Sequence, residues 1–324
     1  MSAKTYREAL NEALRAEMEK DENVILFGED IGVHGGGFGV TSGLLQQFGP
    51  DRVIETPISE SAFAGTAVGA AMSGLRPVVE LMFSDFASVC LDQIINQAAK
   101  VHFLSNGKLN VPLVIRAGAG GGTGAGAQHS QSLEQLYCNV PGLKVVVPSN
   151  AYDAKGLLIS AVRDENPVIF LEGKLLYDSA CEVPDGEYEL PIGKAALCRE
   201  GSDVSLISWG RCVGMCLDAA DMLAERGVSA EVLDLRTLSP LDSQAVLKTA
   251  EKTGRVVIAH ESVQFAGFGA EIAALIAGSD AAQKLKAPIK RVGARFCPVP
   301  AAQNLEAYVL PDTARILSAV NEII

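Results

Sequence analysis

The chain has 324 residues, of which 48% are hydrophobic, and its formal net charge is −12. A chain of this length and composition can fill the cores of two ordinary domains, which excludes an intrinsically disordered protein. No lysine and arginine cluster interrupts the acidic surplus, so we expect neither nucleic acid nor a membrane surface as a partner.

The N-terminal stretch MSAKTYREALNEALRAEMEK alternates charged and apolar residues at helical spacing. This pattern predicts a helix and not a signal peptide, and no apolar run approaches the roughly 20 residues of a membrane span. The seven cysteines lack a paired CxxC framework. Cys212 and Cys216 lie four apart on a predicted helix, but two ligands do not close a zinc site. We expect reduced, buried thiols in a cytoplasmic protein.

Short runs rich in β-branched residues alternate with longer helical patterns in the first half of the chain. Strands are predicted at 24–27, 76–80, 111–116, 144–148 and 167–172, and helices at 60–74, 85–104 and 151–163. This rhythm is typical of a parallel α/β domain.

From about residue 173 to 202 the pattern lapses into a segment rich in proline, glycine and glutamate, which predicts an interdomain connection. The alternation then restarts with the strands DVSLIS, SAEVLDL, RVVIAH and PIKRVG. Helices are predicted to end at Gly227 and Gly254, to cover 269–277, and to begin again near Thr313. We therefore expect two α/β domains, over 1–185 and 186–324.

Ligands of open parallel sheets gather at the carboxyl ends of the strands. Candidate residues at these ends are Glu29 with Asp30, Glu60, the glycine-rich segment that leads to His129, and His260 with Glu261. Local sequence leaves Glu60 open between a carboxylate favoured by a helix N-terminus and a buried acid in a close-packed setting.

The segment GGTGAGAQHSQS fits a dinucleotide fingerprint at Gly122, Gly124 and Ala127. The match is weak, because the glycine run is longer than the tight turn needs and the next strand ends at Pro148 without an acidic residue for a ribose. Two alternatives remain: a structural loop where backbones pass closely, or a mobile loop that places His129 near a reaction.

Five blocks carry a family resemblance: FGED, ETPISESAFAGTAVGAAMSGLRPVVE, DFASVCLDQIINQAAK, AQHSQSLEQLYCNVPGLKVVVPS and AYDAKGLLISAVRDENPVIFLE. Together they closely resemble the beta subunit of the thiamine-diphosphate-dependent 2-oxo acid dehydrogenases, from about Thr5 to Pro311. This family forms the decarboxylating first component of pyruvate, branched-chain and acetoin complexes. The resemblance implies a transketolase-like architecture, with an N-terminal pyrimidine-binding domain and a smaller C-terminal domain.

The resemblance also implies partners. Such beta subunits work in α2β2 heterotetramers, dock on a lipoyl-bearing acyltransferase core, and share the cofactor with an alpha subunit. The alpha subunit holds the diphosphate and magnesium through a GDG motif, and this chain contains no GDG. The chain is therefore expected to hold only the pyrimidine half and to be inactive alone.

Individual residues fall on family positions. Glu60 corresponds to the glutamate that hydrogen-bonds the pyrimidine nitrogen N1′, which lets the neighbouring amine act as a base. Phe86 corresponds to the aromatic that packs on the pyrimidine, and Glu29 to a carboxylate near the cofactor. His129 corresponds to a channel histidine suited to acyl transfer to the lipoyl group.

The block AVRDENP matches a potassium-binding loop of some members. The resemblance implies a structural ion held by Leu113, Ala161, Val162, Asp164 and Asn166, whose oxygens suit an alkali cation. A helix end followed by a turn is the alternative. His34 and His102 have no family support and are expected at the surface or in packing, and a direct role for His260 stays open.

The resulting hypothesis is an enzyme subunit for oxidative decarboxylation of a 2-oxo acid with transfer of the acyl group to lipoyllysine. Pyruvate is the first choice of substrate, followed by acetoin and branched-chain 2-oxo acids. The alternative of another class is a non-catalytic docking subunit. A single-chain transketolase relative would need the diphosphate motif that is missing.

Overall fold

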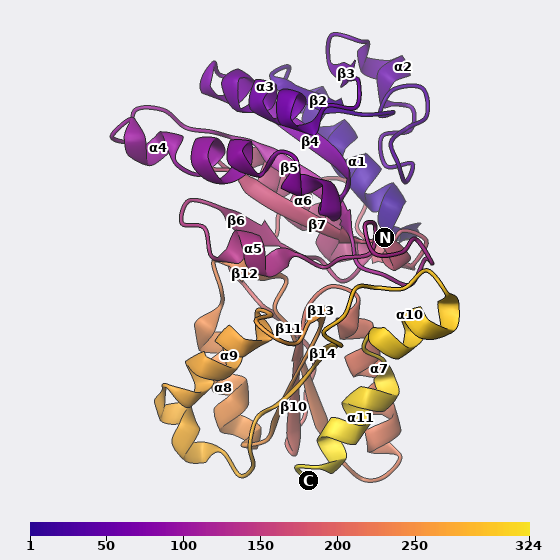
Figure 1. The fold of residues 1–324 in the computed structure, drawn as a ribbon, viewed down its shortest axis with the longest axis vertical. Coiled ribbons are helices and arrows are strands. Elements are labelled where there is room, and N and C mark those ends of the chain that lie inside the picture. Colours follow the sequence, from indigo (N-terminus) through magenta and orange to yellow (C-terminus); the bar gives the residue numbers. More distant parts are fainter. The chain divides into compact units, whose positions relative to one another are not determined.

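The computed structural model describes all residues from 1 to 324, and they form two compact units (Figure 1). The first unit comprises 1–119 and 136–192, and the second comprises 120–135 and 193–324. The glycine-rich segment and His129 thus belong to the second unit, although their neighbours along the chain on both sides belong to the first.

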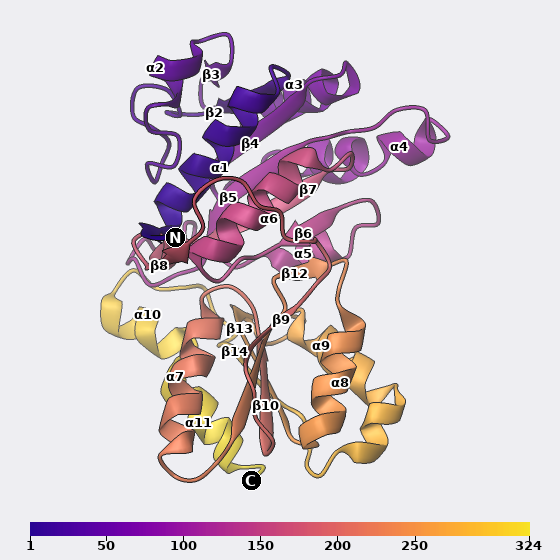
Figure 2. The ribbon, with the colours of Figure 1, turned by 180° about the vertical axis from the view of Figure 1, so that it is seen from behind.

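The sheet of the first unit is parallel, with strands in the order β6-β7-β5-β4-β2-β3. These are β2 (Val24–Gly28), β3 (Val53–Glu55), β4 (Arg76–Phe83), β5 (Val114–Ala119), β6 (Lys144–Val146) and β7 (Val168–Gly173). Every residue of β2 is buried, because helices cover both faces of the sheet. Figures 1 and 2 show α1 (Tyr6–Lys20) and α6 (Ala151–Arg163) on one face and α3 (Glu60–Met72) on the other.

Helix α1 illustrates how the sequence specifies this packing. Thr5 and Glu8 form a capping box that satisfies backbone amides at the helix start. Tyr6, Leu10 and Leu14 recur every four residues, so they form one buried stripe, which packs against α6. A two-stranded antiparallel ribbon, β1 (Ser2–Thr5) with β8 (Ala180–Val183), joins the two ends of this unit.

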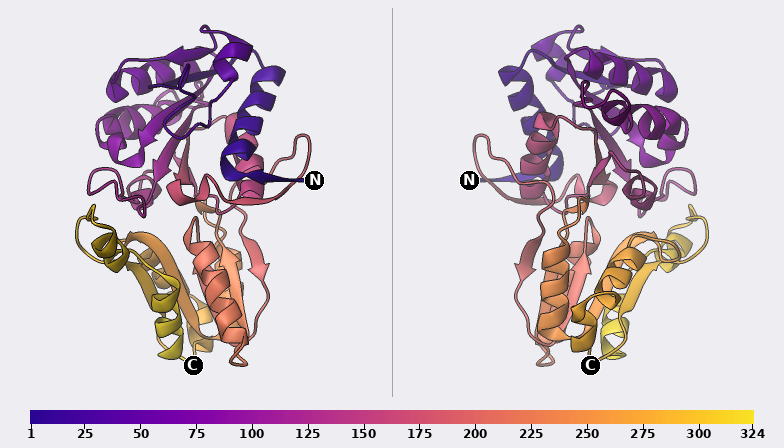
Figure 3. Two further views of the ribbon diagram at one scale, coloured as in Figure 1. Left: turned by 90° about the vertical axis from the view of Figure 1, so that its right-hand side faces the viewer. Right: turned by 90° about the vertical axis from the view of Figure 1, so that its left-hand side faces the viewer.

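The second unit has a five-stranded sheet in the order β14-β13-β10-β11-β9, parallel except for the edge strand β9. The strands are β9 (Ala196–Arg199), β10 (Val204–Ser208), β11 (Ala230–Asp234), β13 (Val256–Val263) and β14 (Lys290–Ala294). Helices α7 (Cys212–Ala224) and α11 (Thr313–Asn321) cover one face, and α8 (Ser243–Thr253) and α9 (Gly269–Ala277) cover the other (Figure 3). Helix α10 (Gln303–Val309) precedes α11.

Most predicted elements are present in chain order, and α6 has its predicted bounds. The predicted helix over 85–104 is wrong as a single element: the structure has a 3-10 turn (Ser84–Ser88), a π turn (Gln93–Ala98) and α4 (Val101–Leu104). A π turn inserts one residue into the helical repeat, and the 3.6-residue period does not reveal it. The short elements α2 (Leu44–Phe48), α5 (Glu134–Cys138), β9, α10 and β12 (Thr237–Ser239) were not predicted. No helix has the length and apolar character needed to cross a bilayer.

Candidate active site

Glu60 is the first residue of α3 and is only 8% exposed. The helix follows Ser59, and its buried face is built from small and apolar residues, including Phe63 and Ala64. Both features that local sequence had left as alternatives therefore occur together. The carboxylate lies at a helix N-terminus, where negative charge is favoured, and it is also buried.

Glu29 follows strand β2 directly and lies close to Glu60. Burial, together with the negative charge of Glu60, raises the pKa of the Glu29 carboxyl, and the backbone N–H of Ser59 partly offsets this. The Glu29 Oε1 atom is buried without a hydrogen-bond partner. Two carboxyl groups thus share one edge of the sheet, and a buried acceptor there is available to a polar ligand.

Phe86 lies in the 3-10 turn that follows β4, and its side chain is half-buried. Its ring packs edge-on against Phe83, with 5.4 Å between the ring centroids, and Phe83 packs in the same way against Phe38, with 5.6 Å between centroids. Phe38 in turn stacks on Tyr177 at 4.8 Å. This aromatic row fixes the position of Phe86 and offers an apolar edge for a planar ring.

A buried ion network, which the sequence patterns did not predict, holds the same end of the sheet. Arg116 donates to Glu172 at 2.7 and 2.9 Å and to Glu80 at 3.0 Å, and Tyr177 donates to Glu172 at 2.7 Å. Burial raises the pKa of Glu80, although the charge of Arg116 opposes the shift. Glu80 also accepts from the Gly37 amide at 2.9 Å, which anchors the loop after β2. In the sequence, one charged residue inside each of three apolar strand runs was the pattern that could have predicted this network.

In the second unit, the glycine loop binds protein carboxylates. The amides of Gly122 and Gly124 donate to the two oxygens of Glu306 at 2.8 and 2.9 Å, and the Gly121 amide donates to Glu261 at 2.8 Å. Positive φ angles at 120, 122, 124 and 126 turn these amides toward the acceptors. The amides that a dinucleotide phosphate would need are therefore already used, which removes the phosphate-cradle interpretation.

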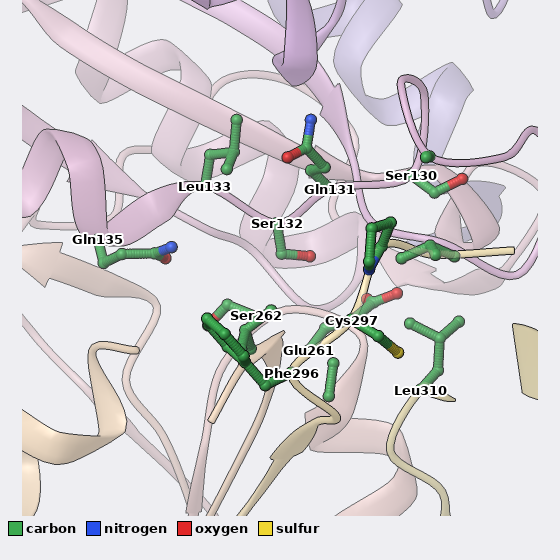
Figure 4. Close-up of a pocket in the computed structure, with 15 residues that line it drawn as sticks. Ser130, Gln131, Ser132, Leu133, Gln135, Glu261, Ser262, Phe296, Cys297 and Leu310 are labelled. Carbon is green, nitrogen blue, oxygen red and sulfur yellow. The ribbon is translucent and has the colours of Figure 1, made fainter. Parts of the chain in front are cut away.

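His129 is half-buried at the end of this loop, and its amide donates to the Gly126 carbonyl at 3.3 Å. A cavity of about 480 Å³ lies in the same unit (Figure 4). Its walls come from Ala127, from residues 130–133 and 135, and from the ends of β13 and β14 with Phe296, Cys297 and Leu310. Glu29, Glu60 and Phe86 belong to the first unit, whereas His129 belongs to the second.

His260 has a packing role in the second unit. The imidazole is fully buried, stacks on Trp209 at 5.2 Å, and is bonded through Nδ1 to Ser262 Oγ at 2.9 Å. Burial lowers the pKa of His260 to about 4, so the ring is neutral at physiological pH. His34 and His102 are exposed, in agreement with their expected surface positions.

The proposed potassium ligands lie at the end of α6 and at the start of β5. Two of these oxygens already bind a cationic side chain: Arg76 donates to the carbonyls of Val162 and Asp164 at 3.2 and 3.3 Å. Lys144 forms an ion pair with the Asp164 carboxylate. The carbonyls of Leu113 and Ala161 accept backbone amides, and Asn166 bonds to Asp164 at 2.9 and 3.1 Å. The oxygen atoms of the predicted potassium site are present, but in this structure Arg76 and Lys144 bind those of Val162 and Asp164.

Comparison with known proteins defines the family. The model of the transketolase pyrimidine-binding domain matches residues 2–179, and that of the transketolase C-terminal domain matches residues 193–316. The chain is 45% identical to the pyruvate dehydrogenase E1 component subunit beta of Rickettsia felis, over 98% of both chains. This chain belongs to the beta subunits of the thiamine-diphosphate-dependent 2-oxo acid dehydrogenases.

Other relatives of this beta subunit are named for different substrates. It is 48% identical to the acetoin:2,6-dichlorophenolindophenol oxidoreductase subunit beta of Bacillus subtilis, over 98% of this chain and 96% of that one. It is 45% identical to the 2-oxoisovalerate dehydrogenase subunit beta of the same organism, over 100% and 99%. An inactive beta4 tetramer of a split-gene transketolase shares the fold, with a TM-score of 0.81 at 23% identity over 98% and 97% of the chains.

The first unit of this beta subunit fits the pyrimidine half of the family cofactor. A ring with nitrogen donors would donate a hydrogen bond to the unpartnered Glu29 Oε1 or to Glu60, and its plane would pack against the Phe86 ring. No group of three or more histidine, cysteine, aspartate or glutamate side chains has the geometry of a metal site.

Proposed function

We propose that this beta subunit, together with an alpha subunit in an α2β2 heterotetramer, catalyses the oxidative decarboxylation of a 2-oxo acid and transfers the acyl group to a lipoyllysine. The acceptor would be carried by an acyltransferase core. Pyruvate is the substrate that we put first, on the basis of the relatives named for pyruvate dehydrogenase. Magnesium and the diphosphate would be held by the alpha chain, because this sequence has no GDG motif.

The observation that carries the proposal is the pair of carboxyl groups at the end of the first sheet, the buried Glu60 and the half-buried Glu29. Thiamine diphosphate supplies a nucleophilic carbon and an electron sink when it is bound. Glu60 would hold a proton against the pyrimidine nitrogen N1′, and the low-dielectric site would strengthen this hydrogen bond. Burial and the nearby charge of Glu60 raise the pKa of Glu29, so the protonation of one carboxyl group depends on the charge of the other. Phe86 would hold the plane of the pyrimidine ring.

His129 would act in the second half-reaction. An imidazole can donate and accept protons near neutral pH, which would suit reductive acylation of an incoming lipoyl disulfide, whose leaving sulfur needs a proton. His129 is half-buried, and its chain neighbours Ala127 and Ser130 line the cavity of the second unit, which supports this role.

Acetoin is the second candidate substrate, because the acetoin relative from Bacillus subtilis shares 48% of its residues with this chain. Most of the acyl pocket would come from the alpha chain, so the beta subunit alone sets few contacts with the substrate. The deciding assay uses the co-purifying alpha chain and compares pyruvate, acetoin and branched-chain 2-oxo acids side by side.

Reconstitution tests the catalytic roles. We expect Glu60→Gln to lower kcat by about 10² to 10⁴-fold, because an amide cannot supply the proton. His129→Ala should lower overall lipoyl-dependent activity by about 10² to 10⁴-fold, to a residual rate that is still measurable, and spare the decarboxylation step. Glu182→Gln, an exposed residue of β8, is the matched control. Full turnover by Glu60→Gln would refute the assignment, and an alpha/beta mixture that binds no thiamine diphosphate in calorimetry would favour the docking subunit.

We further propose that the loop at Asp164 binds potassium when Lys144 moves aside. The ion would then replace the ammonium group on the Asp164 carboxylate and gain the carbonyls of Ala161 and Val162. Potassium should raise Tm above its value in sodium, and more strongly in Lys144→Met. Equal Tm values in the two salts for both proteins would exclude the ion.

A further inference from the structure

We propose that Glu306 is a positioning residue for His129, acting as a carboxylate clamp on the glycine loop. Glu306 lies on α10 and is only 2% exposed, yet no lysine or arginine pairs with it among its hydrogen bonds. Both carboxylate oxygens are used, one by the Gly122 amide at 2.8 Å and one by the Gly124 amide at 2.9 Å. The inference rests on the proposed role of His129.

The loop is shaped around this carboxylate. A side chain added at Gly121 would place its Cβ 2.8 Å from Leu310 and 3.3 Å from Glu306 Oε1. The φ angles of Gly122 and Gly124 are +95° and +70°, which point alternate amides to the same side of the chain. Backbone amides that converge in this way form an anion-binding concavity, and here the anion is supplied by the protein. Backbone bonds to a carboxylate are charge-assisted and so stronger than bonds between neutral groups.

Two further contacts close the loop. Glu261 accepts the Gly121 amide at 2.8 Å and pairs with Arg211 at 3.2 Å. At the base, the Gly120 amide donates to the Gln131 carbonyl at 3.1 Å. The segment that carries His129 is therefore held at its base and at the Glu306 clamp.

Glycine gains more backbone freedom than any other residue when such contacts are lost. With Glu306 removed, the residues between the clamp and the base would sample many conformations, and His129 would spend less time at its working position. A displacement of about 1 Å in a catalytic group can cost about 100-fold in rate. Glu306 thus acts through the loop and needs no contact with the reacting atoms.

The test uses the reconstituted α2β2 assembly with Glu306→Ala and Glu306→Gln. Alanine removes both acceptors, whereas glutamine keeps the shape and one acceptor but turns an N–H donor toward a backbone amide. We expect Glu306→Ala to lower kcat/KM for the lipoyl acceptor by about 10-fold or more. Decarboxylation measured with an artificial electron acceptor should change little in either variant. For the lipoyl acceptor, kcat/KM of Glu306→Gln should lie between the values of the wild type and Glu306→Ala.

A double-mutant cycle with His129→Ala separates positioning from general damage. If Glu306 acts through His129, adding Glu306→Ala to His129→Ala should cost nothing more. Additive losses, or equal losses in lipoyl transfer and decarboxylation, would overturn the proposal. Glu271→Gln, an exposed residue of α9, is the matched control.

Hydrogen exchange on the same assembly gives a readout that does not depend on activity. Glu306→Ala should remove the protection of the amides at residues 121–124 and leave β10 and β13 unchanged. Unchanged protection of the loop would refute the clamp even if the wild-type assembly turned over no 2-oxo acid. Loss of protection with no wild-type turnover would instead count against the proposed function alone.

Discussion

His260 should make the second unit sensitive to acid. The ring is packed against three glycines: a Cβ at Gly269, Gly267 or Gly293 would lie 2.6, 2.8 or 2.9 Å from it. No water can therefore solvate a charged imidazole there, and burial lowers the pKa from 6.5 to about 4. Between these pH values the unfolded chain binds a proton that the folded chain does not, so stability falls as the pH falls.

The magnitude follows from the two pKa values. Below pH 4 the full difference destabilises the unit by about 3 kcal/mol relative to pH 7.5, and at pH 5 the loss is already about 2 kcal/mol. His260→Asn keeps a polar atom near Ser262 and removes the titration. We expect the variant to be less stable at pH 7.5, because the stacking on Trp209 is lost, and to lose about 2 kcal/mol less than wild type on going to pH 5.

Urea denaturation followed by tryptophan fluorescence measures this difference. Trp209 is the single tryptophan of the chain and stacks directly on His260, so its emission reports the second unit. His102→Asn, which changes an exposed imidazole, should keep the wild-type pH dependence. Parallel stability curves for wild type and His260→Asn between pH 5 and 7.5 would refute the argument.

Three further predictions concern stability. Arg116→Met should lower the free energy of unfolding by about 3–5 kcal/mol, because it leaves the buried carboxylates of Glu80 and Glu172 without a counter-charge. Loss of an exposed ion pair costs under about 1 kcal/mol. Urea denaturation midpoints of Arg116→Met and of a variant that removes an exposed arginine test this difference. Burial raises the pKa of Glu134, so ionising it costs stability above its unfolded pKa, and Glu134→Gln should gain Tm relative to wild type as the pH rises from 5 to 8. Gly214→Ala in α7 has open space around its Cβ and should add about 0.5–1 kcal/mol, measured by urea denaturation.

Local sequence patterns account for much of the fold. The apolar runs and their spacing predicted the parallel strands β2, β4 and β7, and the caps placed helices such as α6. They also placed Glu29 and Glu60 at strand ends, and the structure brings the two carboxylates together. Short pieces such as α2 and α10 have too few residues for a period to emerge, so only their packing partners reveal them.

The family blocks and the glycine run could be read directly from the sequence, since both depend on residues that are close along the chain. The role of the glycine run could not, because its amides are bound by Glu306 and Glu261, which lie more than a hundred residues away. The network around Arg116 likewise joins three separate strands. Hydrogen bonds between distant segments depend on the register of a folded sheet or loop, so tertiary structure alone decided that the glycines hold a carboxylate and not a phosphate.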